Sequence, residues 1–297
     1  MFYDLKLVIA YHYDYPTDRA RNMLRLMPRS LAGVQAVHEA TLHIDPVPDE
    51  QHDLTDYFGT CMSQVAWARP VSSLRFEVRA KVERKEDPRK MDFSARLTAL
   101  PRDLAASMSL KPDAPHHFTH PSPRIPRVPA ITAFGADCVS PAMSTYEAIA
   151  AIGHAIHREM EFDASATTAE TPAHEAFEAR RGVCQDFAHI MITALRGIGI
   201  PAGYVSGFLR TNPPEGQERL EGADAMHAWV RAWAGAEMGW VEFDPTNDQF
   251  AGTDYITVGY GRDYADVAPV RGALRGVGGA KTTQAVDVIP RPHLGAV

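Results

Sequence analysis

A cysteine at the predicted start of a helix is the clearest candidate for covalent chemistry. Cys184 follows Gly182 and Val183 and opens a stretch in which apolar residues recur at helical spacing as far as Ile198. The unpaired amides and the positive dipole end of a helix stabilise a thiolate, the reactive form of cysteine. Free cysteine is also a common core residue, so a buried structural role is the alternative. The side chains around the thiol decide between the two.

A histidine and an aspartate later in the chain are the candidate partners of that thiol. His227 begins an apolar strand that runs to Trp233, and Asp244 ends the next predicted strand. If these strands are antiparallel neighbours joined through the turn at Gly235 and Gly239, the histidine and the aspartate lie side by side. A base oriented by a carboxylate would then activate the cysteine. A histidine that is only hydrogen-bonded within the core is the alternative.

Two further polar residues lie close to Cys184 in the sequence. On a helix, position +2 points about 200° away and position +5 about 140° away. Asp186 is therefore predicted to cap backbone amides or to pair with Arg180 or Arg181, and His189 is not expected to act as the base.

The first part of the chain is predicted to be rich in β-strands. Residues 3–13 and 74–82 alternate between apolar and polar side chains, which is typical of strands with one buried face. A weaker pattern of the same kind covers residues 38–44. The mixed charges from Lys81 to Lys90 are predicted to be a solvated strand end.

Residues 111–130 hold six prolines and are predicted to form an extended connection. The segment contains His116, His117 and His120. Extended proline-rich chain does not fix ligand geometry, and only Asp113 lies nearby as a further ligand, so no metal site is predicted.

The rest of the chain changes to helical and then strand patterns. Ser144 and Glu147 form a capping box before a helix that runs to about Met160. A second helix is predicted with Thr171 as its cap and Pro172 as its first residue, followed by the helix that Cys184 begins. Strands are expected over 202–209, 227–233, 240–243, 255–260 and 282–288. The predicted fold class is α+β, with a β-rich domain over 1–110, a connection over 111–140 and a catalytic domain of helices packed on an antiparallel sheet over 141–297.

The composition is that of an ordinary soluble protein. The 297 residues carry 30 Lys and Arg against 37 Asp and Glu, a formal net charge of -7, and 45% are hydrophobic. An acidic balance argues against a general nucleic-acid or membrane surface. Cys61 and Cys138, the other cysteines, are expected to be packing residues, and the set lacks both a disulfide framework and the CxxC spacing of a zinc site. No signal peptide and no run of roughly 18 apolar residues is recognisable, so a cytoplasmic protein is predicted.

Several motifs together resemble the transglutaminase-like superfamily. In the second half they are Gly182-Val-Cys-Gln-Asp-Phe-Ala-His189, Gly199-Ile-Pro-Ala-Gly-Tyr-Val-Ser-Gly207, His227-Ala-Trp229 and Gly239-Trp-Val-Glu-Phe-Asp-Pro-Thr246. The first domain is similar to the bacterial transglutaminase-like N-terminal region through Tyr11-His-Tyr-Asp-Tyr15, Leu24-Arg-Leu-Met-Pro-Arg29 and Asp56-Tyr-Phe-Gly59. Gly261-Arg-Asp-Tyr-Ala-Asp-Val267 resembles the tail of the bacterial relatives, so the likeness covers nearly the whole chain.

The resemblance implies a papain-like core with a catalytic triad. Cys184 would be the nucleophile, His227 the general base and then acid, and Asp244 the residue that orients the histidine. The family attacks a carboxamide or peptide carbonyl, forms a thioester and passes the acyl group to an amine or to water. No calcium-binding segment is recognisable, so calcium activation is not expected, and no cofactor is predicted.

The residues that would assist the triad are less well defined. No tryptophan lies near Cys184 to stabilise the oxyanion, which leaves the backbone amide of Cys184, the side chain of Gln185 and Tyr204 as candidates. Trp229, Asp263 and Asp266 are candidates for the substrate cleft, although the two aspartates could instead brace their loop.

Three functions follow from these residues. Hydrolysis of amide or peptide bonds is favoured, because water at roughly 55 M outcompetes an amine unless the site excludes it. Amine transfer to a protein glutamine is the second, and a non-catalytic peptide-binding module is the third. A peptide or protein substrate is expected, with a possible amine acceptor and no nucleic acid or membrane partner. The sequence does not determine the oligomeric state.

Overall fold

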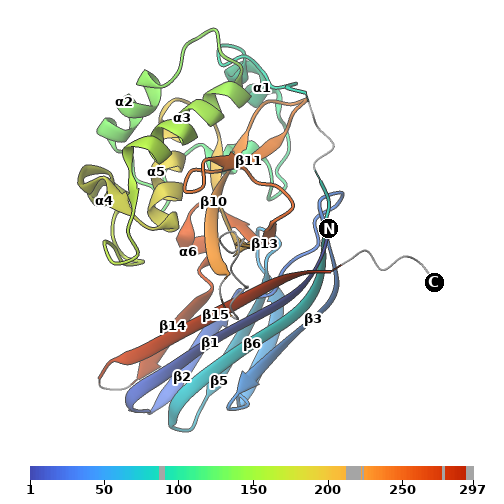
Figure 1. The fold of residues 1–297 in the computed structure, drawn as a ribbon, viewed down its shortest axis with the longest axis vertical. Helices are drawn as coiled ribbons and strands as arrows, with labels where there is room; N and C mark the ends of the chain where they lie inside the picture. Colours follow the sequence, from blue (N-terminus) through green and yellow to red (C-terminus); the bar gives the residue numbers. More distant parts are fainter. Residues whose placement is uncertain (87–90, 212–221, 223, 276–277, 292–297) are drawn as a thin grey trace, which may run out of the picture.

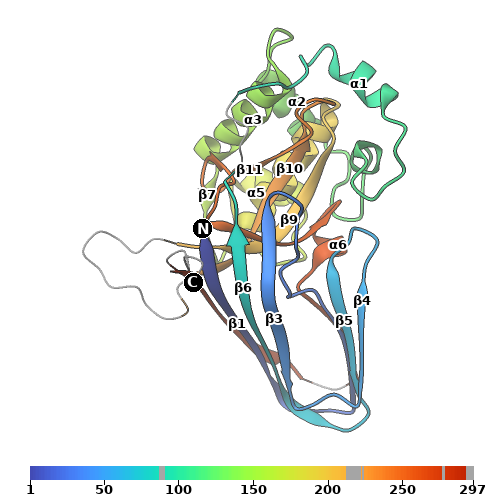
Figure 2. The same ribbon diagram turned by 90° about the vertical axis from the view of Figure 1, so that its right-hand side faces the viewer.

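Two antiparallel sheets form a sandwich at one end of the molecule (Figures 1 and 2). The computed structural model describes residues 1–86, 91–211, 222, 224–275 and 278–291. Within these, the first sheet has the order β15 (Ala280–Arg291), β1 (Phe2–Thr17), β6 (Val71–Arg84) and β3 (Gln35–Asp45). The second has the order β14 (Val270–Arg275), β2 (Arg19–Leu24), β5 (Cys61–Trp67) and β4 (Glu50–Thr55).

The alternating patterns of the first eighty residues produce this sandwich. On β1 the side chains of Leu5, Leu7 and Ile9 are buried, and on β6 those of Phe76 and Val78 are buried. The core of the sandwich therefore lies between the two sheets, on the face that the alternation predicts.

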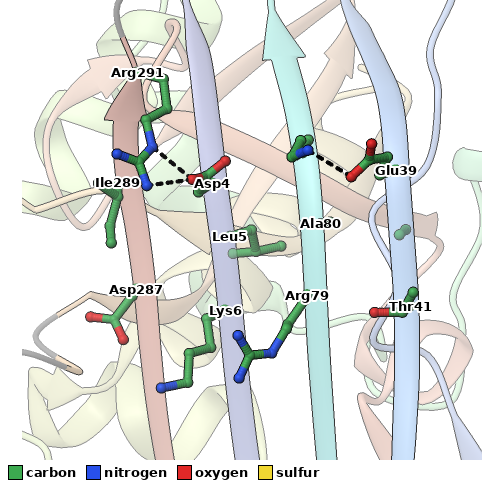
Figure 3. Close-up of a pocket in the computed structure, with 12 residues that line it drawn as sticks. Asp4, Leu5, Lys6, Glu39, Thr41, Arg79, Ala80, Asp287, Ile289 and Arg291 are labelled. Atoms are coloured by element: carbon green, nitrogen blue, oxygen red, sulfur yellow. Dashed lines mark hydrogen bonds and ion pairs between the residues drawn. The ribbon is translucent and has the colours of Figure 1, made fainter.

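The outer face of the first sheet carries charged side chains (Figure 3). Asp4 pairs with Arg291 at 2.6 Å and Glu39 pairs with Lys81 at 2.8 Å, each across neighbouring strands. These side chains cover a solvated face. Part of the predicted charged strand end, residues 87–90, lies outside the described residues.

The last two strands correct the predicted domain boundaries. β15 pairs with β1 over the whole length from Phe2↔Arg291 to Tyr13↔Ala280, and β14 pairs with β2. Residues 270–291 therefore complete the sandwich and do not belong to the catalytic domain predicted over 141–297. Alternation identifies a strand but not its partner, and here the partner lies at the other end of the chain.

A third sheet, with helices on one face, forms the other end of the molecule (Figure 1). Its order is β12 (Gln249–Phe250), β11 (Trp240–Asp244), β10 (Ala225–Trp233), β9 (Ala202–Leu209) and β13 (Tyr255–Gly261). The central helix, α5 (Cys184–Gly197), lies against β9 and β10. Around it pack α2 (Pro129–Asp137), α3 (Thr145–Glu159) and α4 (Ala173–Ala179), which confirms the expected α+β order.

This five-stranded sheet is held between the helices and the sandwich. Ala228 and Val230 of β10 pack into the helical core, whereas Phe208 of β9 and Ile256 and Val258 of β13 belong to the core of the sandwich. Burial of apolar side chains on both faces of the sheet makes the two ends of the molecule one packed unit.

Several helix boundaries follow from capping chemistry. Ser144 Oγ accepts a hydrogen bond from Glu147 N at 3.1 Å, and the Glu147 carboxylate accepts one from Ser144 N at 2.8 Å, so the predicted capping box is confirmed. α4 begins one residue later than predicted, because Pro172 is its N-cap and not its first residue.

The connection predicted over residues 111–140 is not wholly extended. It contains a short 3₁₀ helix, η1 (Pro115–Phe118). Its last part forms α2, which begins at Pro129. Proline has no amide hydrogen, but the amide of the first helical residue has no acceptor within the helix. Pro129 can therefore start α2. The remaining elements are α1 (Leu100–Ala106), α6 (Tyr264–Val267) and the short strands β7 (Glu161–Phe162) and β8 (Arg181–Gly182).

No helix in the described part of the chain is long and apolar enough to cross a membrane.

A charge placed on β15 will test the position of this strand in the sandwich. Val288 is fully buried opposite Leu5, so Val288→Asp should lower the free energy of unfolding by about 3 kcal/mol or more in a urea titration. Gln284→Asp, at an exposed position of the same strand, should change it by less than about 1 kcal/mol. Equal effects of the two variants would contradict the observed strand order.

Candidate active site

The start of α5 holds Cys184 in a fixed position. Val183 is the N-cap residue of the helix, and its amide donates to Asp186 Oδ2 at 2.8 Å. A side chain at Gly182 would place its Cβ 2.6 Å from the same oxygen, so only glycine fits there. Thr167 Oγ1 also donates to Asp186 Oδ2, at 2.5 Å. Asp186 is thus a capping residue that positions the turn before the cysteine.

The predicted neighbours His227 and Asp244 are brought together by adjacent strands. β10 and β11 are antiparallel and are joined through Gly235 and Gly239, which both have positive φ angles. His227 Nε2 lies 2.6 Å from Asp244 Oδ2. Both side chains are buried, which strengthens the interaction between them.

Asp244 accepts hydrogen bonds from every side. Besides His227, the amides of Thr246 and Asn247 donate to Oδ1 at 2.9 and 3.3 Å. Asn247 Nδ2 and the Tyr255 hydroxyl donate to Oδ2 at 2.7 and 2.8 Å. Burial alone would raise the pKa of Asp244, but the hydrogen bonds from His227, Asn247 and Tyr255 outweigh it and lower the pKa. The carboxylate is therefore ionised and fixes the histidine ring.

The thiol of Cys184 meets the remaining side of the histidine ring. Its interaction with the ring helps to raise the pKa of His227, and since Nε2 faces Asp244, the nitrogen left for the sulfur is Nδ1. Burial would lower the pKa of His227, but the hydrogen bonds to Asp244 and Cys184 outweigh it and raise the pKa to about 10. The ring is therefore an imidazolium at neutral pH, next to a half-buried thiol. This is the charge distribution that a thiolate nucleophile needs.

His189 has a different environment. Its Nε2 accepts a hydrogen bond from Tyr264 N at 3.2 Å, and burial lowers its pKa to about 4. It is a neutral acceptor that holds the start of α6.

The oxyanion candidates differ in what their donors already contact. Gln185 Nε2 donates to the carbonyl of Ala169 at 3.1 Å, so this side chain is directed to the 163–172 loop. The amide of Cys184 is at the first position of α5 and has no acceptor within the helix. Tyr204 is buried beside Cys184, and no hydrogen bond involves its hydroxyl among the described residues. Burial and then the charge of Cys184 raise the pKa of Tyr204, which keeps the hydroxyl protonated and able to donate.

The residues predicted for the substrate cleft have structural contacts. Trp229 is fully buried, and its Nε1 donates to Glu242 at 2.8 Å. Asp263 is fully buried and accepts from the amides of Arg124 and Ala265, both at 2.8 Å. Neither residue therefore lines an open cleft, and the prediction was wrong for both. Alternation and motif position do not show whether a neighbouring layer covers a side chain.

Asp266 braces its own loop. Its two oxygens accept from the guanidinium of Arg262 at 2.8 and 3.0 Å. The bracing role is therefore the one that its contacts support.

The sequence did not identify two residues that support the pair. Asn247 follows Asp244 by three residues and closes the turn around it, so its position in the motif was an available signal. Tyr255 comes from the far edge of the sheet, and Gln249 Nε2 donates to its hydroxyl at 2.9 Å. No local pattern could have connected Tyr255 with Asp244.

The other cysteines and histidines are separate from this site. Cys61 is exposed on β5 and so is not the packing residue that was expected, because its side chain points away from the core of the sandwich. Cys138 is half-buried, and burial raises its pKa. No group of three or more metal-ligating side chains occurs within the described ranges, and His116 and His117 bond to the carbonyls of Ser107 and Lys111.

Two family models match this chain. The model of the transglutaminase-like superfamily matches residues 132–245, which include Cys184, His227 and Asp244. The model of the bacterial transglutaminase-like N-terminal region matches residues 3–83, the first strands of the sandwich.

Similar proteins are found in several bacteria. An uncharacterized protein of Mycobacterium tuberculosis (strain ATCC 25618 / H37Rv) is 34% identical over 245 residues, 78% of this chain and 75% of that protein. One of Mycobacterium leprae is 29% identical over 94% of this chain and 95% of that protein. A protein-glutamine gamma-glutamyltransferase of Pseudomonas aeruginosa is 40% identical over 72 residues, 24% of this chain and 10% of that protein.

A solved structure shares the fold over nearly the whole length. It comes from Cytophaga hutchinsonii and is provisionally described as a cysteine protease. The TM-score is 0.74 at 20% sequence identity, and the match covers 97% of this chain and 90% of that one.

Removal of the Asp244 charge should change the protonation of the histidine. The hydrogen bond from His227 to the carboxylate stabilises the imidazolium, so Asp244→Asn should lower the pKa of His227 from about 10 by at least about one unit. Titration of the ring signals by ¹⁵N NMR measures this pKa directly. His189, with a pKa of about 4, serves as the internal control. An unchanged pKa for His227 would show that Asp244 does not stabilise the imidazolium.

The Tyr204 hydroxyl can be tested as an oxyanion donor. Tyr204→Phe should lower the rate of acylation by about a hundredfold with little change in KM. It should leave the Tm unchanged, because no described residue is hydrogen-bonded to this hydroxyl. The rate is measured by single-turnover mass spectrometry with a peptide amide. Full activity in this variant would leave the Cys184 amide as the remaining candidate.

Proposed function

The chain belongs to the transglutaminase-like superfamily, and on that basis we propose that it is a cysteine-dependent enzyme that hydrolyses amide or peptide bonds. The observation that carries the proposal is the position of His227, which contacts Cys184 on one side and Asp244 on the other. The three side chains come from α5, β10 and β11, and their contacts suit nucleophilic catalysis by a thiolate.

Acylation uses the ion pair of Cys184 and His227. The sulfur attacks the carbonyl carbon of the amide, and the carbonyl oxygen becomes an oxyanion that the Cys184 amide and Tyr204 would stabilise. As the carbon–nitrogen bond breaks, the imidazolium of His227 gives its proton to the leaving amine. A thioester on Cys184 and a neutral imidazole remain.

Deacylation uses the neutral histidine as a base. Water gives a proton to His227 and forms a bond to the acyl carbon, and the carbon–sulfur bond breaks. A carboxylic acid and the original ion pair result. The half-buried position of Cys184 supports hydrolysis, because solvent reaches a side chain that is not enclosed.

Amine transfer is the second candidate. The relative from Pseudomonas aeruginosa that matches over 72 residues is a protein-glutamine gamma-glutamyltransferase. In that reaction a primary amine takes the place of water in the second step. A peptide-binding module without catalysis is the third candidate, and the presence of all three catalytic side chains argues against it.

The proposed chemistry also suggests a location. The thiolate must stay reduced to attack a carbonyl, so a reducing compartment suits the enzyme. We therefore propose a cytoplasmic protein with a peptide or protein substrate.

An acyl-enzyme on Cys184 is the direct test of this proposal. When the protein is mixed with a panel of peptide amides and quenched in acid, intact-mass spectrometry should show one added acyl group, located at Cys184 by digestion. Cys184→Ala should form no adduct and keep its circular dichroism spectrum, and Cys61→Ala, at an exposed position, should react normally. Turnover by Cys184→Ala would refute the nucleophile.

The same mixture separates hydrolysis from transfer. With a fluorescent primary amine present at millimolar concentration, hydrolysis predicts mainly the free acid, and a crosslinking enzyme would give mainly the amine conjugate.

A further inference from the structure

A charged pocket is lined by residues of the sandwich and of α6. Figure 1 shows α6 on the side of its sheet that faces the sandwich. It has a volume of about 530 Å³, and its walls come from both ends of the molecule. Arg25 follows β2, Arg271 belongs to β14, and Arg262 precedes α6. Three guanidinium groups from separate segments therefore converge on one pocket.

The carboxylates in this pocket are fully engaged. Asp56 Oδ2 accepts from Arg25 Nε at 3.0 Å, and its other oxygen accepts from the amides of Phe58 and Thr60 at 3.0 and 2.9 Å. Asp266 is held by Arg262. Two carboxylates thus face three guanidinium groups.

The positive charge that remains is on Arg271. This side chain is exposed and makes no hydrogen bond or ion pair with the described residues. The charge of Arg25 is compensated by Asp56, but this side chain offers a further donor, because it is only a tenth exposed and its buried Nη1 has no hydrogen-bond partner among the described residues. The chain as a whole has a net charge of -7, so this pocket has the opposite sign to the rest of the molecule. A local excess of positive charge attracts anionic groups.

The charged hollow on the outer face of the first sheet shows the contrast (Figure 3). There Asp4 pairs with Arg291, and Glu39 pairs with Lys81. These two pairs compensate charge across neighbouring strands, whereas Arg271 has no such partner in the part of the chain that the structure describes.

The pocket is connected to the catalytic site through one short helix. Tyr264 begins α6, and its ring packs against Tyr204 with the centroids 6.2 Å apart. Tyr204 lies beside Cys184, while Ala265 and Asp266, the next residues of α6, line the pocket. α6 therefore contributes to both places, and a peptide with its amide at Cys184 would have to pass along α6 to reach the arginines.

We propose that this pocket binds a carboxylate side chain of an acidic peptide substrate, with Arg271 as the main contact. The inference rests on the proposed function, since it concerns the substrate of the same site. A free guanidinium binds a carboxylate through two parallel hydrogen bonds. The hydroxyl of Tyr57, which lies 3.1 Å from His117 Nε2 at the rim, offers a further polar contact. The sandwich would then select substrates for the catalytic domain.

Binding to the inactive variant tests the pocket apart from the chemistry. Full-length Cys184→Ala is titrated with fluorescein-labelled peptides of eight residues that hold glutamate at one of several positions from a central glutamine, and with the same peptides carrying glutamine there. Fluorescence anisotropy at low salt gives each Kd. At the right spacing the glutamate peptide should bind about tenfold more tightly than its counterpart.

Two arginine variants distinguish binding at this pocket from a general electrostatic attraction between the peptide and the protein. Arg271→Gln should abolish the preference for glutamate, because it removes the free guanidinium. Arg19→Gln, at an exposed position on the neighbouring strand β2, changes the net charge equally and should leave the preference intact. Both positions are exposed, so both variants should fold.

Three outcomes would overturn the proposal. The first is equal binding of all peptides, and the second is an equal loss in both arginine variants. The third is binding of inorganic phosphate that depends on Arg271 without any preference among peptides, which would assign the pocket to a free anion. Since no turnover is measured, none of these results depends on whether Cys184 forms a thioester.

Discussion

The proposed mechanism requires a buried carboxylate that stays ionised, and Asp244 meets that requirement through donors from three parts of the chain. His227 comes from β10, the Asn247 turn follows β11, and Tyr255 comes from β13 at the far edge of the sheet. A buried charge without these partners would cost several kcal/mol. The strand order of the five-stranded sheet therefore helps to set the pKa of His227, because it brings these donors to Oδ2 of Asp244.

The proposed nucleophile belongs to a different layer. Cys184 is placed by the helix start, where Gly182 allows the close approach of Asp186. Its contact with His227 depends on how α5 packs on β9 and β10. Packed interiors are as dense as organic crystals, so the separation of these layers is well defined. The apolar face of α5 thus sets the geometry of the proposed ion pair as directly as the three reacting side chains do.

The sandwich supports the other face of the catalytic sheet. Phe208 and Ile256 are buried in its core, so the two ends of the molecule are not independent. Its strands also bring Arg25 and Arg271 next to α6. The start of this helix is fixed by the hydrogen bond from Tyr264 N to His189. In the proposed function, one end of the molecule supplies the chemistry and the other supplies charge for the substrate. The close packing between the two ends fixes the position of the arginines relative to the proposed site.

Local patterns determined most of the elements and the candidate residues of the site. Alternation identified the strands, capping chemistry identified the helix starts, and the motifs around Cys184, His227 and Asp244 predicted the three side chains of the proposed site. Each of these signals lies within a few neighbouring residues. The tertiary structure alone decided that β15 completes the sandwich, that Trp229 is covered, and that Tyr255 reaches Asp244. The reason is that strand partners, burial and charge balance depend on segments far apart in the chain, which no local period records.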